Sequence, residues 1–310
     1  MKILKPKFWD QNYFTFLSIL LFPISLLYRF ILFLRKLFVA EKKFAIPIIC
    51  VGNIYIGGTG KTPISLKICK ILKEFNQNPV IIKKNYKNHI DEISLIKKHN
   101  KVLTSEKRGD AIIQAIEKKF NFAVLDDGYQ DLSIKKNLNI VCFHGKQKLG
   151  NGHLIPAGPL RESLDALKNC QIILINGNKD LEFEQKLKRY NSKLNFFYYN
   201  YYSKNIENFK NKKLIAFAGI GNPQNFFDFL KENYLNIVQE IHYPDHYEYK
   251  EKDLEDLSKL ENKYNAKLIT TEKDYLRISP FLRKKFDYVK LELKFQDEEG
   301  FKNNLKKLIV

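Results

Sequence analysis

A glycine-rich segment that ends in lysine and threonine is the part of this sequence best suited to bind a phosphate group. It follows the apolar run Ile46–Val51 and precedes an amphipathic stretch from Pro63 to about Phe75. This order of strand, glycine loop and helix is the context that a phosphate-binding loop requires, because its backbone N–H groups and the helix N-terminus attract the anion. Tyr55 departs from the usual pattern, which has a glycine five residues before Gly60.

The residue types of this loop suit a nucleotide and its metal ion, so ATP and Mg²⁺ are the expected cofactors. Lys61 would reach the β- and γ-phosphates, and the hydroxyl group of Thr62 would be a ligand of Mg²⁺. The residues expected to contact the nucleotide are Gly57, Gly58, Thr59, Gly60, Lys61 and Thr62. The alternative interpretation is a glycine-rich turn with a lysine on the surface.

A pair of aspartates ends a second apolar run and is the expected partner of the glycine loop. Asp126 and Asp127 follow Phe122–Leu125, and open α/β sheets bind ligands at the carboxyl ends of their strands. Mg²⁺ prefers hard oxygen ligands such as carboxylates. We therefore expect Thr62, Asp126 and Asp127 to hold the metal, with Asp127 also needed for catalysis. An ordinary Asp-Asp-Gly turn is the alternative.

A rigid loop at residues 155–162 carries one Arg–Glu pair, Arg161 and Glu162. We interpret it as a charged loop over the phosphates, with a structural turn as the alternative. On their own, three further polar motifs indicate only a polar loop, a surface turn and a helix cap: these are Asp91-Glu92, Pro244–Tyr247 and Thr270–Asp274.

The elements expected to carry these residues alternate along the chain. Strand-length apolar runs lie at Ile46–Val51, Val80–Lys83, Val102–Thr104, Phe122–Asp126, Ile140–Phe143 and Ile172–Ile175. Helical patterns lie at Lys61–Phe75, Gly109–Phe120 and Asp180–Tyr190. Such alternation predicts a parallel α/β sheet with helices on both faces.

A second α/β set begins after an aromatic stretch at residues 196–202, which we expect to form linker strands. Its strands are predicted at Leu214–Ala218, Ile237–His242, Lys267–Thr271 and Tyr288–Leu293. Its helices are predicted at Pro223–Tyr234, Lys250–Tyr264 and the C-terminus. The predicted fold class is α/β. It combines a P-loop NTPase-type parallel sheet domain at 44–205, a smaller α/β domain at 206–310 and a membrane-associated helical segment at 1–43.

The N-terminal segment is suited to a membrane surface. Residues 13–28 contain no charged side chain, and Arg29, Arg35 and Lys36 follow them. This run is shorter than the roughly 20 residues that span a bilayer as a helix, and Pro23 would break or kink it. We interpret the segment as a helix or helical hairpin in the membrane interface. A membrane span and a core or oligomer helix are the alternatives.

The charge of the chain invites a nucleic-acid partner, but its composition argues against one. The 310 residues include 53 Lys and Arg against 34 Asp and Glu, a formal net charge of +19. Only seven of the 53 basic residues are Arg, the residue that reads guanine edges and grips phosphates with two parallel hydrogen bonds. The cysteines form no C-x-x-C pair, which indicates reduced thiols.

Taken together, the motifs resemble those of the tetraacyldisaccharide 4′-kinase family, the lipid A 4′-kinases of Gram-negative bacteria. The matching segments are Val51–Pro63, Asp91-Glu92, Arg108–Asp110, Asp126–Gln130, Leu154–Glu162, Gly219–Pro223, Pro244–His246 and Thr271–Asp274. The resemblance runs from the N-terminal segment to about residue 277 and so covers nearly the whole chain. The combination of Gly-Gly-x-Gly-Lys-Thr-Pro with Pro-Ala-Gly-Pro-Leu-Arg-Glu is highly specific.

The resemblance implies ATP- and Mg²⁺-dependent phosphorylation of the 4′-hydroxyl of an acylated glucosamine disaccharide 1-phosphate, which gives lipid IVA in lipid A biosynthesis. It also implies two α/β/α domains with the active site in the cleft between them. The expected partners are the lipid substrate and the cytoplasmic face of the inner membrane, where the enzyme would be peripheral or monotopic. Neither a nucleic acid nor an obligate protein partner is expected. A membrane-tethered regulatory ATPase is the alternative function, and a nucleic-acid-binding ATPase is a third.

The resemblance also suggests roles for single residues. Asp91 is expected to accept the proton of the hydroxyl group, assisted by His246 from the other domain, which would couple catalysis to domain closure. Arg161 and Glu162 would complete the phosphate and metal environment. Lys84-Asn85-Tyr86 stands where the family usually has Arg-Gly-Tyr, so only the tyrosine matches, and it is the expected substrate contact of this loop.

Overall fold

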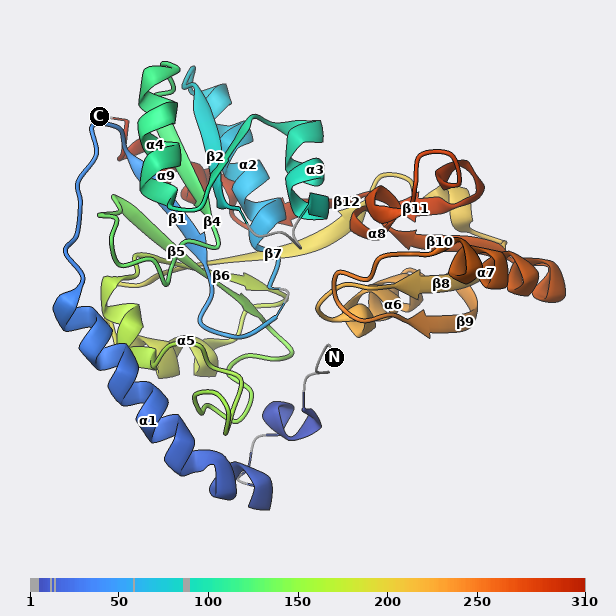
Figure 1. Ribbon diagram of the computed structural model, residues 1–310, viewed down its shortest axis with the longest axis horizontal. Coiled ribbons are helices and arrows are strands. Elements are labelled where there is room, and N and C mark those ends of the chain that lie inside the picture. The colour runs from blue at the N-terminus through green and yellow to red at the C-terminus, as the bar shows by residue number, and fades with distance from the viewer. Residues whose placement is uncertain (1–5, 12, 14, 58, 86–89, 310) are drawn as a thin grey trace. The chain divides into compact units, whose positions relative to one another are not determined.

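The contacts of the chain divide it into two compact units, each described separately below. The computed structural model (Figure 1) describes residues 6–11, 13, 15–57, 59–85 and 90–309. The larger unit is built from the described parts of Lys5–Asn85, His99–Asn200 and Leu293–Val310, and the smaller from those of Tyr86–Lys98 and Tyr201–Glu292. Of the described residues, the contacts thus group 90–98 with the smaller unit and 293–309 with the larger. The sequence-based limits instead assign 90–98 to the P-loop domain and 293–309 to the smaller α/β domain.

An eight-stranded sheet forms the centre of the larger unit, in the order β12-β7-β6-β5-β1-β4-β2-β3. The strands are β1 (Ile48–Gly52), β2 (Pro79–Lys84), β3 (Val102–Ser105), β4 (Phe122–Asp126), β5 (Leu138–His144), β6 (Ile172–Asn176), β7 (Asn195–Ser203) and β12 (Leu291–Phe295). Neighbouring strands from β7 to β3 pair in parallel. Every residue of β1 and β4 is buried, as central parallel strands covered on both faces require. The predicted parallel α/β sheet is confirmed.

The helices of the larger unit either connect these strands or lie near the ends of the chain. They are α2 (Lys61–Glu74), α4 (Arg108–Glu117), α5 (Leu181–Lys188) and α9 (Glu298–Lys306), besides the N-terminal α1 (Phe16–Phe38). Short 3₁₀ turns lie at η1 (Lys7–Asp10) and η2 (Leu164–Asn169). Helix α2 follows β1 and the glycine loop and buries Ile64, Ile68 and Leu72. This spacing of four residues places one apolar stripe against the sheet, so the helix presents its first residues, Lys61 and Thr62, at the loop.

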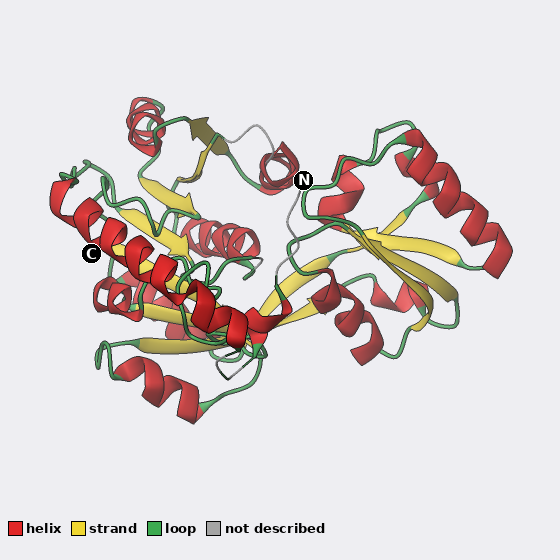
Figure 2. Ribbon diagram, turned by 60° about the horizontal axis from the view of Figure 1, so that its bottom comes forward, coloured by secondary structure: helices red, strands yellow, loops and turns green. Residues whose placement is uncertain are grey.

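The smaller unit contains a four-stranded parallel sheet in the order β11-β10-β8-β9, visible in Figure 2. Its strands are β8 (Lys213–Ala218), β9 (Asn236–His242), β10 (Lys267–Thr271) and β11 (Asp287–Val289). Its helices are α3 (Ile90–His99), α6 (Pro223–Glu232), α7 (Glu251–Tyr264) and α8 (Glu272–Arg277), with 3₁₀ turns at η3 (Ile206–Phe209) and η4 (Arg283–Lys285). Alternate residues of β8 pack into two separate cores, Ala216 with α6 and Phe217 with α7. Since successive strand residues point to opposite faces, helices cover both faces of this sheet.

Three predicted elements differ from the structure. The single strand predicted at Tyr288–Leu293 is divided between β11 and β12, which belong to different sheets. The aromatic stretch at 196–202 is a single strand within β7 rather than separate linker strands. Tyr198 and Tyr199 are buried beside β6, and the division between the two units falls within this strand, after Asn200. Asp91 and Glu92 lie in the first turn of α3 rather than in a loop, a position where carboxylates favour the partial positive charge of a helix N-terminus.

The N-terminal segment forms one continuous helix. Helix α1 has 23 residues and continues through Pro23, so the predicted break does not occur and the segment is not a helical hairpin. The helix is long and apolar enough to cross a membrane by length and composition, and only 11% of its most apolar 18-residue window is buried. That low burial distinguishes it from the core helix of a soluble protein.

Candidate active site

The glycine loop has the backbone shape of an anion-binding loop. Gly57 and Gly60 have φ angles of +115° and +77°, conformations that a side chain would strain. Gly60 is the residue before α2, so the free N–H groups of the first helical turn face the loop. Asn53 fixes this shape, because its side-chain amide donates to the carbonyl oxygen of Gly57 at 3.2 Å and to the Thr59 hydroxyl at 2.9 Å. Gly58 lies outside the described residues.

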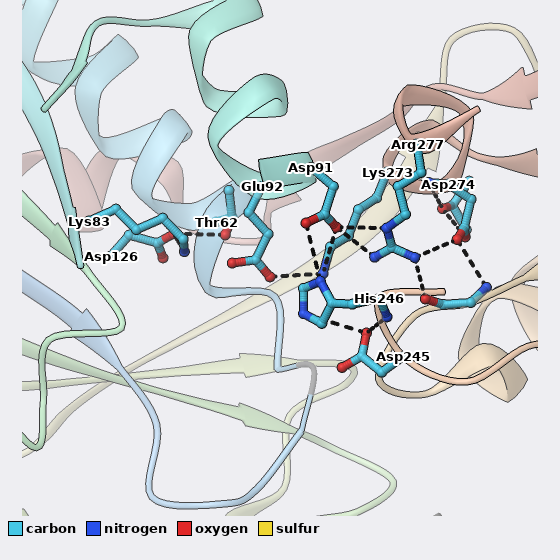
Figure 3. A network of polar contacts seen from close by, with 12 residues as sticks. Thr62, Lys83, Asp91, Glu92, Asp126, Asp245, His246, Lys273, Asp274 and Arg277 are labelled. Carbon is cyan, nitrogen blue, oxygen red and sulfur yellow. Dashed lines mark hydrogen bonds and ion pairs between the residues drawn. The ribbon is translucent and has the colours of Figure 1, made fainter. Parts of the chain in front are cut away.

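Asp126 is the buried anchor of the metal-binding end of the site. Its side chain is fully buried at the end of β4, and its Oδ2 accepts a hydrogen bond from the Thr62 hydroxyl at 2.8 Å. The Nζ of Lys83 lies 2.6 Å from the same oxygen and is almost fully buried (Figure 3). Because β2 and β4 are neighbours with Ile82 opposite Leu125, Lys83 reaches Asp126 at the carboxyl ends of both strands.

Asp127 carries the second charge cluster of the larger unit. Its Oδ1 lies 3.6 Å from the Nζ of Lys61 and 2.9 Å from the Nη2 of Arg161. Although burial opposes ionisation, Lys61 and Arg161 hold the pKa of Asp127 well below its usual range. Its φ is +58°, and Arg108 donates to its carbonyl oxygen at 2.7 Å. The structure thus brings Lys61, Thr62, Asp126, Asp127 and Arg161 together.

Glu162 is placed differently from Arg161. Its side chain is buried, with 4% of the residue exposed, and its Oε2 has no hydrogen-bond partner among the described residues. Burial raises the pKa of Glu162, while Lys36 and Arg35 of α1 and the neighbouring Arg161 lower it. Among the described residues, Glu162 therefore makes no hydrogen bond or ion pair with the aspartate pair. Tyr86, the expected substrate contact, lies outside the described residues.

A separate charge cluster in the smaller unit centres on Asp91 (Figure 3). Its Oδ1 lies 3.1 Å from the Nδ1 of His246. Its Oδ2 accepts hydrogen bonds from the Nε and Nη2 of Arg277 at 2.9 and 2.6 Å, and Lys273 lies 3.5 Å from the same oxygen. Burial raises the pKa of Asp91, but His246, Lys273 and Arg277 together hold it well below its usual range. Asp91 is therefore an anion at neutral pH.

The Asp91–His246 pair is suited to receive a proton. A carboxylate beside one imidazole nitrogen holds the ring in one orientation and stabilises its protonated form. The sequence interpretation places the two residues on different domains, but both belong to the smaller unit because the N-terminal turn of α3 is grouped with that unit. Since Asp91 and His246 lie in the same unit, the structure gives no support for a link between catalysis and domain closure that depends on these two residues coming from different domains.

The carboxylates of the larger unit suit a metal that is also held by phosphates. No group of three or more His, Cys, Asp or Glu side chains within the described part of the chain is arranged to hold a metal ion. Mg²⁺ in nucleotide sites is bound by one or two carboxylates together with substrate phosphates and water. The oxygen atoms of Thr62, Asp126 and Asp127 fit that pattern.

The comparison with known proteins decides the family. The family model described as tetraacyldisaccharide-1-P 4′-kinase (LpxK) matches residues 17–310. This chain belongs to the tetraacyldisaccharide-1-P 4′-kinase family. The resemblance expected from the motifs is confirmed.

Relatives from other bacteria match the chain over almost its whole length. It is 41% identical to the tetraacyldisaccharide 4′-kinase of Pelagibacter ubique, covering 99% of both chains, and 38% identical to that of Rickettsia bellii, covering 90% of both. A crystal structure of the "apo" form of LpxK from Aquifex aeolicus in complex with ATP is 24% identical, with a TM-score of 0.70. It covers 95% of this chain and 100% of its own, and this likeness confirms the fold of a 4′-kinase.

Several residues that contact the aspartates of these two clusters, or shape the glycine loop, were not predicted from the sequence. Asn53 and Arg108 lie within matching motifs, so their positions carried a signal but their contacts did not. Lys83 and Arg277 had none, because their partners Asp126 and Asp91 are distant in sequence. Only the pairing of β2 with β4, and the position of α8 near α3, bring these cations to their carboxylates.

Proposed function

We propose that this chain transfers the γ-phosphoryl group of ATP to the 4′-hydroxyl of a tetraacyldisaccharide 1-phosphate. One observation carries the proposal: Lys61, Arg161 and Asp127 meet beside a left-handed glycine loop in a member of this kinase family. The Aquifex relative was solved in complex with ATP, which supports ATP as the donor. A regulatory ATPase without an acceptor is not favoured, since curated relatives carry the name of a lipid kinase.

The larger unit would bind the nucleotide. The N–H groups of the glycine loop and the first turn of α2 would accept the phosphates. Lys61, whose side chain is 14% exposed, would neutralise the β- and γ-phosphates, and Arg161 would add a second cation. Both cations form ion pairs with Asp127 in this structure. Binding of the phosphates would therefore draw Lys61 and Arg161 partly away from that carboxylate.

Thr62, Asp126 and Asp127 are the residues that would hold Mg²⁺. When bound, the ion would neutralise charge on the phosphates during transfer. Oδ2 of Asp126 already accepts a hydrogen bond from the Thr62 hydroxyl and pairs with the Lys83 ammonium group. Lys83 and a bound Mg²⁺ would therefore compete for the same oxygen atom. The cations beside the two carboxylates are Lys61, Lys83 and Arg161, which makes the site attractive to a polyphosphate and less so to a free metal ion.

The smaller unit would accept the proton. The oxygen of the 4′-hydroxyl forms a bond to the γ-phosphorus as the bond from that phosphorus to the bridging oxygen breaks, and ADP leaves with the electron pair. The hydroxyl proton passes to Asp91, with His246 orienting that carboxylate and sharing the charge. A carboxylate with a lowered pKa suffices for this role, because protein kinases also use an aspartate as the proton acceptor in a loose transition state.

The dependence of ATP turnover on the acceptor tests this function. We expect little ADP formation from ATP and Mg²⁺ alone, and a large increase when a tetraacyldisaccharide 1-phosphate is added in detergent micelles. The same lipid already phosphorylated at its 4′-position is the matched control and should not stimulate turnover. ADP formation that is equally fast with and without the acceptor would favour a regulatory ATPase instead.

Helix α1 supports a position at the membrane, because it buries polar residues and exposes apolar ones. A surface helix of a soluble protein does the opposite. Ser18 and Ser25 are its buried residues, and the Ser25 hydroxyl donates to the carbonyl oxygen of Leu154 at 2.9 Å. Its large apolar side chains are exposed, including Leu20, Leu27 and Ile31. A continuous apolar surface of this kind marks an interaction site. We propose that it lies in the cytoplasmic face of the inner membrane.

Replacing Leu20, Leu27 and Ile31 together with glutamine should release the protein from membranes without unfolding it. Each buried leucine-sized side chain contributes roughly 1.5–3 kcal/mol, so partitioning should fall more than about a hundredfold. Flotation with vesicles of phosphatidylethanolamine and phosphatidylglycerol measures it, and thermal unfolding should not change. Leu181→Gln, on the exposed surface of α5, is the control. Unchanged flotation of the triple variant would mean that another surface binds the membrane.

Removing the cation beside Asp126 should strengthen binding of a free divalent metal. In Lys83→Met the ammonium group no longer competes for Asp126 Oδ2, so we expect Mn²⁺ to bind the nucleotide-free chain at least roughly tenfold more tightly. Electron paramagnetic resonance titration with Mn²⁺ measures this without any enzyme assay. The control is Lys84→Met, the next residue of β2, whose side chain points to the other face. Equal affinity in all three proteins would mean that Asp126 does not face the metal.

A further inference from the structure

The motif Thr271–Asp274 and the loop after β8 have no assigned part in the proposed reaction, yet they surround Arg277. We propose that Arg277 is the positioning residue of the Asp91–His246 pair, and that Thr271, Asp274 and Gly219 hold it in place for that task. This inference rests on the proposed function, since it gives the pair a support that the proposed reaction needs.

Arg277 binds one of the two oxygen atoms of Asp91 and leaves the other to His246. Its Nε and Nη2 both donate to Oδ2, at 2.9 and 2.6 Å, which leaves Oδ1 for the Nδ1 of His246 at 3.1 Å. Two N–H groups of one rigid, planar guanidinium group therefore hold the position of Oδ2. The side chain of Arg277 is 7% exposed and that of Asp91 is 4% exposed. Little solvent is therefore available to replace this contact.

Asp274 in turn fixes Arg277. It is fully buried, and its Oδ1 accepts hydrogen bonds from Arg277 Nη1 at 2.8 Å, from the Tyr249 hydroxyl at 3.0 Å and from the Gly219 N–H at 3.1 Å. Its Oδ2 accepts from the Thr271 hydroxyl at 2.7 Å. A buried carboxylate with this many donors has a single orientation. The helix cap predicted at Thr271 is observed, and its side chain also aligns Asp274.

The contacts close into a ring. The His246 N–H donates to the carbonyl oxygen of Gly219 at 3.1 Å, and the N–H of the same Gly219 donates to Asp274. The ring therefore runs from Asp274 through Gly219, His246, Asp91 and Arg277 back to Asp274. A side chain at Gly219 would meet Asp274 Oδ1 at 3.2 Å and Pro244 O at 3.1 Å, so a larger residue here would push against the carboxylate of Asp274. Arg277 is the member that joins α8 to Asp91.

The charges that face Asp91 set the direction of its response. Lys273 and Arg277 of α8 and His246 of the loop after β9 face it, and Glu92 is the acidic neighbour on its own helix. Loss of Arg277 removes one cation while Lys273 and His246 remain. The pKa of Asp91 should then rise towards its ordinary value, because a positive charge near a carboxylate favours its ionised form. Protonation of Asp91 would then inactivate the pair at a higher pH than in the unaltered chain.

Arg277→Gln and Arg277→Lys test the positioning role. For Arg277→Gln we expect kcat to fall roughly a hundredfold, as for a misplaced catalytic group, with the KM for ATP unchanged and the acid limb of the kcat/KM profile shifted to higher pH. Arg277→Lys should return the acid limb of the kcat/KM profile most of the way to its original pH, since lysine keeps the positive charge. It should restore little of kcat, since lysine lacks the planar guanidinium group. Arg283→Gln is the matched control. Within the described part of the chain, Arg283 of the same unit donates to the carbonyl oxygens of Leu276 and Ile278 and lies over the ring of Tyr275, and it has no hydrogen bond to Asp91.

The proposal would be overturned if Arg277→Gln lost no more kcat than Arg283→Gln does and its acid limb stayed at the original pH. A thermal-unfolding double-mutant cycle with Arg277→Gln and Asp91→Asn gives a readout without catalysis, and its two effects should be clearly non-additive. Additive effects would refute the Arg277–Asp91 contact whatever the activity. If the unaltered chain phosphorylated no lipid, the proposed function would be refuted instead. The double-mutant cycle would still test the Arg277–Asp91 contact, because it measures stability and not activity.

Discussion

Lys61→Ala should remove nearly all phosphoryl transfer while the chain stays folded. The ammonium group of Lys61 lies 3.6 Å from Asp127 and is partly exposed, so its loss costs little stability. In the proposed reaction the same group neutralises the β- and γ-phosphates, where charge is greatest during transfer. Removing one such group from a preorganised site costs about 10²–10³-fold in kcat. The fall should be at least this large with saturating lipid acceptor.

A second lysine of the same helix provides the control. Lys67→Ala removes the ion pair of Lys67 with Glu298 at 2.8 Å, away from the glycine loop, and should keep its activity. Asp127→Asn should lose activity as Lys61→Ala does, since it removes the carboxylate that faces Lys61 and Arg161. Circular dichroism and thermal unfolding establish that each variant is folded. A folded Lys61→Ala chain with unaltered turnover would defeat the assignment of the glycine loop.

Asp91→Ala and His246→Ala should each reduce turnover by about 10²–10⁴-fold, the usual contribution of general acid–base catalysis. Their side chains are in contact at 3.1 Å, so each needs the other to accept the proton. Residues that act as one unit are non-additive. The double variant should therefore be little worse than the poorer single variant.

Single-turnover kinetics on the three variants, with a nucleotide-binding titration, separate the possible outcomes. Nucleotide affinity should barely change, because in this account neither side chain holds phosphate. The control is Asp256→Asn, an exposed acid of α7 that pairs with Lys259. Losses that multiply in the double variant would show independent roles. A collapse of ATP affinity in Asp91→Ala would make Asp91 a ligand of the nucleotide or metal.

The sequence predicted the parts of the fold and site that depend on local order. The strand, glycine loop and helix around Lys61 are contiguous, and Asp126 and Asp127 end a strand whose five residues are all buried. The same holds for the cap at Thr271. The contact of Asp91 with His246, 155 positions apart, was expected from the family resemblance and not from spacing.

The remaining features depend on register and on distant packing. Lys83 reaches Asp126 only because β2 lies beside β4, and no local pattern identifies its partner. The run Tyr288–Leu293 reads as one strand, yet its halves pair with different sheets. Pro23 was expected to break or kink a helix, but α1 continues through it without a break, although proline removes one hydrogen bond of the helix.

The product formed from labelled ATP tests the central claim most directly. The full chain is incubated with ATP labelled in its γ-phosphoryl group, Mg²⁺ and a tetraacyldisaccharide 1-phosphate in micelles, and the lipid is analysed by mass spectrometry with fragmentation. The account predicts that the lipid gains one labelled phosphoryl group on the 4′-oxygen, with one ADP formed per group transferred. Label recovered only as inorganic phosphate, with the lipid mass unchanged, would contradict it.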